Sequence, residues 1–269
     1  MSFLLFFFFQ FYFAAATNSA LVATACFYDV GQGHCFLLKT KDDKFGVLVD
    51  AGSSKLPKLT VPQQTEKNKQ AIVSSIAGKA KNISKLLVIC THGDEDHYNL
   101  IKDIVKGRSV GTQTKFVFGG RKEHYNVGKL PEVSGQQPIK FFLDDSSDES
   151  QTNQEISVFF SSGDDGNVPI AVHVLSRGMN SPGQTEEDKN KTSLVVRVIH
   201  RNSDKSFLLT GDAPSTTLNG LQSLKSSVLL ANHHGASLIV SSGNAYAWYA
   251  VCKFFRRLKF FQSAKAYMG

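Results

Sequence analysis

A histidine- and aspartate-rich segment that directly follows a buried-strand pattern places the strongest constraint on this chain. Residues 85–90 form an apolar, β-branched run typical of a strand inside a sheet. The chain then reads T-H-G-D-E-D-H, which puts two imidazoles and two candidate ligand carboxylates between His92 and His97. Imidazole and carboxylate together are typical ligands of zinc, and of manganese where oxygen ligands dominate. A solvated acidic turn is the simpler interpretation, but matching fragments downstream weigh against it.

Other predicted strands also end in side chains that can bind a metal. These side chains are Asp50, Asp212, His233 and His234, and each follows an apolar run. Residues at the ends of several strands can converge on one point even when they are distant in the sequence. The recurrence therefore predicts a metal centre at the edge of a sheet.

The remaining apolar runs predict further strands and helices. Strands are expected at residues 20–27, 35–39, 45–50, 85–90, 114–118, 139–143, 170–175, 193–199, 206–210 and 227–231. Helices are expected at residues 68–80 and from 98 to about 106, whereas residues 53–69 and 176–189 are expected to be loops.

The N-terminal residues are unusually apolar. Residues 1–19 combine a run of Phe and Leu with small residues after it, which is typical of a secretory signal peptide, although no Lys or Arg precedes the run. A weak membrane anchor and an over-extended reading frame are the alternatives. We expect export to the periplasm, the medium or the membrane, and a cytoplasmic location if the segment is no signal. The expected division is a signal-like segment at 1–19, a folded domain at 20–243 and an unassigned basic, aromatic tail at 244–269.

The charge of the chain favours an anionic partner. The net charge is +7 and the pI is about 9.1, which suits nucleic acid, a phosphate substrate or an acidic membrane surface. The tail at 244–269 suits the same partners if it is natural, and a truncated or mistranslated end is the alternative. The four cysteines show no C-x-x-C spacing, so buried free thiols are expected. The chain has none of the long apolar spans of a channel, which excludes transport of DNA by this chain alone.

The ordered motifs resemble the metallo-β-lactamase superfamily, and within it the soluble domain of ComEC-type DNA-internalisation competence proteins. The matching fragments are residues 28–33, 49–52, 92–97, 209–212 and 233–236, with Asn190 and Ser193 leading the strand before the aspartate motif. Two features depart from that pattern. His34 stands where the ComEC-type turn usually has aspartate, and no histidine of the superfamily's third motif is evident between the fragments at residues 92–97 and 209–212.

The resemblance implies an α/β (α+β) fold, a four-layer αββα sandwich that is incomplete at the C-terminus. It also implies one or two divalent ions, zinc or manganese. His92 and Asp94 would hold one ion, and Asp96 and His97 the other. Asp212 would bridge both ions. The resemblance further assigns His233 or His234 to the second ion and Asp29, Gln32, Asp50 and Asn190 to the surrounding structure, with Asp50 ordering the loop.

The activity that the resemblance implies is metal-dependent hydrolysis. The expected substrate is a phosphodiester, so that the chain would act as a phosphodiesterase or nuclease on DNA. Asp96 and Asp212 would be the catalytic carboxylates, and Asp96 could assist proton transfer. One alternative is a hydrolase of a small ester, lactone or thioester, because one fold can host many chemistries. A non-catalytic DNA- or surface-binding protein with a degenerate metal site is the other.

Overall fold

The computed structural model describes most of the chain up to residue 230. The described residues are 8–15, 18–30, 33–54, 62–132, 139–143, 154–155, 169–178, 183, 185–201, 205–214, 217–218, 221 and 226–230. Gln32, His233, His234 and the tail at 244–269 therefore lie outside the described residues.

The larger sheet has strand order β1-β2-β3-β4-β5-β6-β7. The strands are β1 Phe8–Ala15, β2 Asn18–Tyr28, β3 Cys35–Thr40, β4 Phe45–Ala51, β5 Lys85–Cys90, β6 Gln113–Phe118 and β7 Lys140–Phe141. Neighbours from β1 to β4 pair antiparallel, and neighbours from β4 to β7 pair parallel. Because β4 and β5 run in the same direction, the chain leaves both strands at the same edge of the sheet.

The smaller sheet has strand order β12-β11-β10-β9-β8. Its strands are β8 Gln154–Glu155, β9 Ile170–Ser176, β10 Val195–His200, β11 Lys205–Leu209 and β12 Val228–Leu230. The β11–β12 pair is parallel, and the other pairs are antiparallel. The predicted strands of both sheets are thus confirmed, apart from their end residues.

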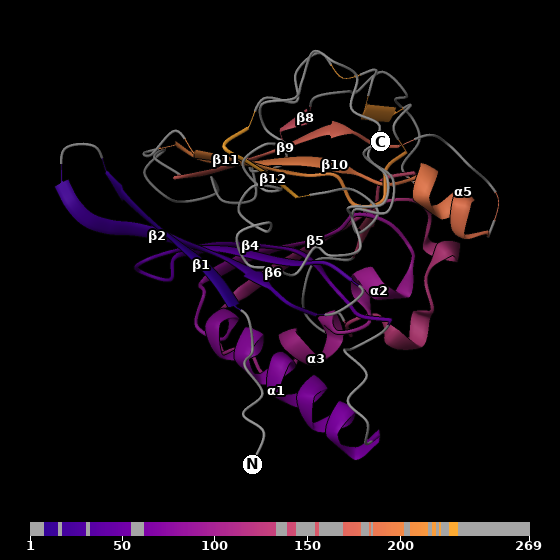
Figure 1. The fold of residues 1–269 in the computed structure, drawn as a ribbon, viewed down its shortest axis with the longest axis horizontal. Coiled ribbons are helices and arrows are strands. Elements are labelled where there is room, and N and C mark those ends of the chain that lie inside the picture. The colour runs from indigo at the N-terminus through magenta and orange to yellow at the C-terminus, as the bar shows by residue number, and fades with distance from the viewer. Residues whose placement is uncertain are drawn as a thin grey trace, which may run out of the picture.

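The two sheets pack face to face (Figure 1). An apolar cluster that includes Phe36 and Ile89 of the larger sheet and Val196 and Phe207 of the smaller one fills the space between them. The rings of Phe36 and Phe207 have centroids 5.0 Å apart. The domain core therefore lies between the sheets, and the loops at the sheet edges are held by it.

Helices cover the other face of the larger sheet. Helix α1 (Pro62–Ala80) and helix α3 (Ile101–Val105) bury Ile76 and Ile104 in a second apolar cluster, which includes strand residues such as Leu48 and Val88. Figure 1 shows both helices below this sheet. Strands buried on both faces explain the unbroken apolar runs of the sequence.

A third, smaller apolar cluster lies on strands of the smaller sheet. It contains Leu175, Val195, Leu208, Ala213 and Leu229. Within the described part of the chain, the structure is a mixed α/β arrangement of one helical layer and two sheets. Leu218, in a helical turn at residues 217–218, and Leu221 pack against this third cluster, but no complete second helical layer is among the described residues.

The helices differ in several places from the sequence prediction. Helix α1 begins at Pro62, six residues earlier than predicted, because proline is well suited to the first turn of a helix. The helix predicted from residue 98 is instead split into α2 (Glu95–Tyr98) and α3. The loop predicted at 176–189 contains the start of α5 (Glu186–Lys191). Thr185 caps α5 by accepting the Asp188 backbone N–H at 3.1 Å.

The N-terminal apolar segment takes part in the larger sheet. Strand β1 pairs antiparallel with β2 from Phe8 opposite Tyr28 to Ala15 opposite Asn18. The division into a signal-like segment at 1–19 and a folded domain from residue 20 stays a prediction. Export through this segment stays a prediction. None of the described helices has the length and apolar character needed to cross a membrane.

Candidate metal centre

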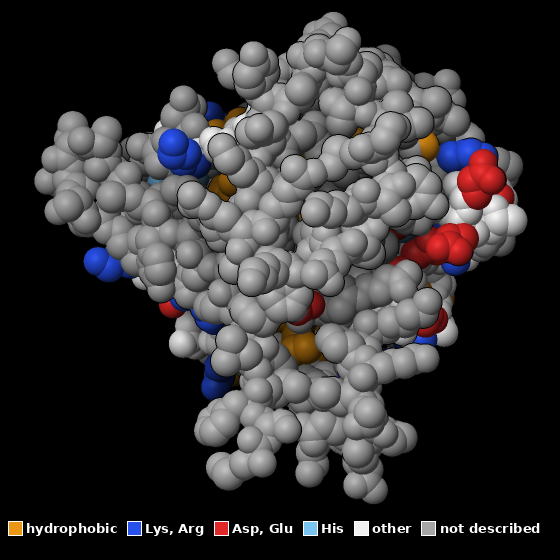
Figure 2. All heavy atoms as spheres, viewed as in Figure 1, with side chains coloured by type: hydrophobic (Ala, Val, Ile, Leu, Met, Phe, Trp, Pro, Cys, Tyr) orange, Lys and Arg blue, Asp and Glu red, His pale blue; other side chains and the backbone are white. Residues whose placement is uncertain are grey.

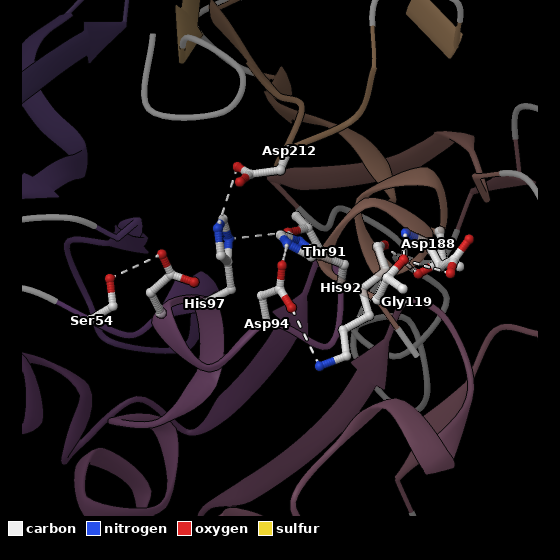
Figure 3. A network of polar contacts seen from close by, with 12 residues as sticks. Ser54, Thr91, His92, Asp94, His97, Gly119, Asp188 and Asp212 are labelled. Carbon is white, nitrogen blue, oxygen red and sulfur yellow. Dashed lines mark hydrogen bonds and ion pairs between the residues drawn. The ribbon is translucent and has the colours of Figure 1, made fainter. Parts of the chain in front are cut away.

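Polar side chains from the ends of β4, β5 and β11 meet at one edge of the paired sheets. Asp50 lies at the end of β4, His92 and His97 follow β5, and Asp212 follows β11. All of these side chains are buried. Figure 3 shows Asp212 reaching the His97 ring from the side opposite to the backbone that carries His97. The convergence expected from the sequence is therefore present for these residues.

Asp50 fixes the orientation of His97. One Asp50 oxygen accepts the Thr91 backbone N–H at 2.7 Å, and the other accepts the Thr91 hydroxyl at 3.0 Å. The second oxygen also lies 3.0 Å from His97 Nδ1. Asp50 has a φ of 52°, a left-handed conformation that Asp tolerates better than most residues. A carboxylate on one imidazole nitrogen directs the other nitrogen, here Nε2, toward a metal position.

The Nε2 atom of His97 faces the second sheet. It lies 3.3 Å from Asp212 Oδ1. The rings of His92 and His97 have centroids 4.1 Å apart, which places two imidazoles side by side in front of Asp212. The contact between His97 and Asp212 joins the segment after β5 to the segment after β11, and so connects the two sheets.

Asp94 links the histidine pair to helix α5. Its Oδ2 lies 3.5 Å from His92 Nε2, and its Oδ1 lies 3.4 Å from Lys189 Nζ. Both Asp94 and Lys189 are partly exposed. The sequence did not indicate Lys189 as a site residue, because α5 lies next to Asp94 only in the folded protein.

The charges of the cluster shift its pKa values in opposite directions. Burial lowers the pKa of His97, but the carboxylates of Asp50 and Asp212 outweigh burial and hold that pKa well above its usual value. Burial raises the pKa of Asp212, yet its hydrogen bond to His97 and the nearby charges of His97, His92 and His34 hold that pKa well below its usual value. A metal cation at His97 would have to displace a tightly held proton.

Two buried groups in this cluster can hold a metal ion. One group is His92, His97 and Asp212, and the other is His34, Asp50 and His97. Within each group the candidate ligand atoms lie within 4.8 Å of one another. The mixture of imidazole and carboxylate fits zinc or manganese.

Other predicted site residues lie outside both groups. Asp96 is partly exposed and accepts a hydrogen bond from Ser54 Oγ at 3.5 Å. Asp29 is exposed, and Asn190 is buried near the end of α5. His124, which lies between the second and fourth motifs in sequence, is buried but belongs to neither group. The contributions of Gln32, His233 and His234 stay predictions, because these residues are not described.

His34 is a site residue that sequence reasoning noted only as a departure. It precedes β3, and its ring centroid lies 5.0 Å from that of His97 in an edge-on arrangement. The signal was present in the pattern of strands, because β3 and β4 form a predicted hairpin and β4 ends in Asp50. A histidine just before the first strand of that hairpin lies beside the end of the second.

Comparisons with known proteins give little further support. No protein-family model and no curated protein matches this sequence. Among solved structures, the chain is similar to a metallo-beta-lactamase from Staphylococcus aureus subsp. aureus COL, with 14% sequence identity and a TM-score of 0.32. The match covers 77% of this chain and 43% of that protein, so the chain spans less than half of its length. Because this likeness is distant, the functional argument depends on the site.

Proposed function

We propose that this chain is a metal-dependent hydrolase. The observation that carries the proposal is the buried group of His92, His97 and Asp212, with Asp50 directing His97 toward Asp212. Buried histidines and carboxylates from three different strand ends are costly to bring together unless they are paired or bind a cation. The ordered motifs further lead us to propose membership of the metallo-β-lactamase superfamily and kinship with ComEC-type domains.

The residues of the cluster have separable roles in this proposal. His92, His97 and Asp212 would hold the cation, with Asp94 as a further carboxylate next to His92. A bound divalent cation supplies Lewis-acid polarisation of the substrate and a water of lowered pKa. Asp50 would keep the His97 ring in place during the reaction. Asp96, at the partly exposed rim, would carry a proton between substrate and solvent.

A phosphodiester is the substrate class we propose. Water would add to phosphorus and give up a proton, the P–O ester bond would break, and the leaving alkoxide would take up a proton, so that a phosphomonoester and an alcohol form. The net charge of +7 and the position of Lys189 beside Asp94 both support an anionic substrate. DNA is one such substrate, and nuclease activity is part of the proposal.

The surface around α5 favours a short phosphodiester over a long nucleic acid. Glu186 and Glu187 are exposed on this helix, close to Lys189. Figure 2 shows acidic side chains grouped at the right over α5, with Lys or Arg side chains beside them and others scattered over the described parts of this face. Long nucleic acids bind mainly through a track of positive charge along the phosphates. We therefore expect mononucleotide-sized diesters and short single strands to be cleaved faster than duplex DNA.

The test combines metal content with hydrolysis. Metal would be measured by mass spectrometry in the wild type, in Asp212→Asn and in Asp103→Asn, an exposed aspartate of α3 that serves as the matched control. Hydrolysis of bis(p-nitrophenyl) phosphate and of single-stranded DNA would be followed with added zinc or manganese. We expect one or two metal ions per chain, and loss of metal and hydrolysis in Asp212→Asn alone.

Each other outcome has a definite meaning. Metal without phosphodiester cleavage would overturn the substrate class and lead to assays of small esters, lactones and thioesters. A folded protein without metal or hydrolysis would overturn the enzymatic proposal and leave a non-catalytic binding protein.

A further inference from the structure

His34 is held beside the metal-capable cluster by the backbone. The Gly52 N–H donates to the His34 carbonyl at 3.4 Å, and the adjacent residue Cys35 pairs with Ala51 in the β3–β4 ladder. This register places His34 at the same end of the larger sheet as Asp50. The ladder that begins at Cys35 and the Gly52–His34 hydrogen bond therefore position the His34 backbone beside the cluster.

Two glycines bring the His34 segment onto helix α2. A Cβ atom on Gly33 would lie 2.1 Å from the Gly52 carbonyl oxygen and 2.7 Å from that of Asp96. A Cβ atom on Gly52 would lie 2.4 Å from the carbonyl carbon of Asp96 and 2.6 Å from the His97 nitrogen. Three backbone segments are therefore packed against one another without intervening side chains. This close approach sets the His34 ring against the His97 ring.

The environment of His34 is that of a ligand rather than a surface histidine. Its side chain is 7% exposed, and His97 and Asp50 contribute the other ligand atoms of its group. Asp50 already accepts hydrogen bonds from the Thr91 backbone N–H and hydroxyl and contacts His97, so Asp50 acts mainly by orienting its neighbours. The atom that this group adds to the centre is then an imidazole nitrogen of His34.

We propose that His34 is a nitrogen ligand of the cation held at His97. This inference rests on the proposed metal centre, and it extends that centre with a residue outside the motifs. His97 belongs to both metal-capable groups, so a cation at His97 has the imidazoles of His34 and His92 and the carboxylates of Asp50 and Asp212 around it. Such a nitrogen-rich set favours zinc, cobalt or another borderline cation over magnesium or calcium.

The experiment uses Co²⁺ as the probe, because its visible absorption reports the number and type of ligands. Binding to the metal-depleted full chain would be titrated for the wild type, His34→Ala, Asp212→Asn and His173→Ala. His173 lies on β9 and belongs to neither metal-capable group, so it is the matched control. Circular dichroism would verify the fold of each variant.

We expect His34→Ala to bind Co²⁺ at least about tenfold more weakly, with an altered absorption spectrum. Added imidazole should restore the wild-type spectrum, because it can fill the space of the missing side chain and supply the nitrogen. A merely structural role for His34 would not give this restoration. His173→Ala should bind as the wild type does.

Other results would separate this inference from the function on which it rests. The role of His34 would be overturned if His34→Ala bound Co²⁺ with the wild-type affinity and spectrum. It would also be overturned if added imidazole failed to restore weakened binding. In either case, loss of Co²⁺ binding in Asp212→Asn would still support the metal centre. Wild-type affinity in Asp212→Asn would instead overturn the proposed centre itself. If His34→Ala does not fold, His34→Asn decides the matter, since a folded His34→Asn with wild-type affinity and spectrum excludes a ligand role.

Discussion

The two sides of the candidate metal centre are built differently. On the side of the larger sheet, Asp50, Thr91 and His97 are buried and joined by contacts of 2.7 to 3.0 Å. On the side of the smaller sheet and α5, Asp212 and Lys189 reach the cluster through contacts of 3.3 and 3.4 Å, and Lys189 is partly exposed. The difference indicates that the larger sheet fixes the positions of the ligands, whereas the smaller sheet and α5 close the centre and supply charge.

The largest effect is expected from removing the carboxylate that organises the larger-sheet side. Asp50→Ala leaves the Thr91 N–H, the Thr91 hydroxyl and the His97 ring without their buried acceptor. We expect the free energy of unfolding of the metal-free protein to fall by about 3–5 kcal/mol. Urea denaturation would measure it, with Asp103→Asn as the exposed control. A loss below about 1 kcal/mol would show that Asp50 does not organise this side.

Proton competition at His97 is expected to give the next largest effect. The carboxylates of Asp50 and Asp212 raise the pKa of His97 above its usual value, so protons compete with a cation for the ring nitrogen. Cation affinity should therefore weaken as the pH falls, by about tenfold per pH unit for each proton displaced. Co²⁺ titrations between about pH 8 and pH 6 would measure the slope, in the range where His titrates. An affinity that does not change with pH would contradict this role of His97.

A smaller effect is expected from the hydroxyl that supports Asp50. Thr91→Val keeps the shape of the side chain but removes the hydrogen bond to Asp50 Oδ2. The backbone N–H of residue 91 still binds the other Asp50 oxygen, so we expect a loss of about 1 kcal/mol in the free energy of unfolding. Urea denaturation beside Thr91→Ser, which retains the hydroxyl, would measure it. An equal loss in both variants would trace the effect to packing.

The smallest effect on stability is expected on the α5 side. Lys189→Met removes a partly exposed ion pair with Asp94, so the free energy of unfolding should change by less than about 1 kcal/mol. The KM for an anionic phosphodiester should rise, while metal content stays unchanged. Lys191→Met is the matched control, because Lys191 pairs with Glu187 on the same helix. A stability loss as large as that of Asp50→Ala would remove the distinction between the two sides.

Much of the fold could be predicted because most of its strands are buried on both faces. Runs such as residues 85–90 are apolar throughout, and the structure confirms them as strands. Helix α5 was missed because it is short, polar and without an apolar stripe. Its capping residue and acidic first turn are the signals that could have revealed it.

The ligand motif was predicted as a loop in which His92, Asp94, Asp96 and His97 hold one or two ions. The structure instead forms helix α2 from Glu95 to Tyr98, which includes both Asp96 and His97. His97 faces Asp212, whereas Asp96 contacts Ser54 outside the metal-capable groups.

The sequence by itself determined the kinds of candidate ligand and their positions after predicted strands, because apolar runs and the polar residues after them are local patterns. It named His92, His97, Asp50 and Asp212 in this way. Only the tertiary structure decided which side chains meet. The contacts of His34 with His97 and of Lys189 with Asp94 join segments that are distant in the chain. The predicted β3–β4 hairpin already placed His34 near Asp50, but the contacts with His97 and Asp94 depend on how β4 pairs with β5 and on how the two sheets pack.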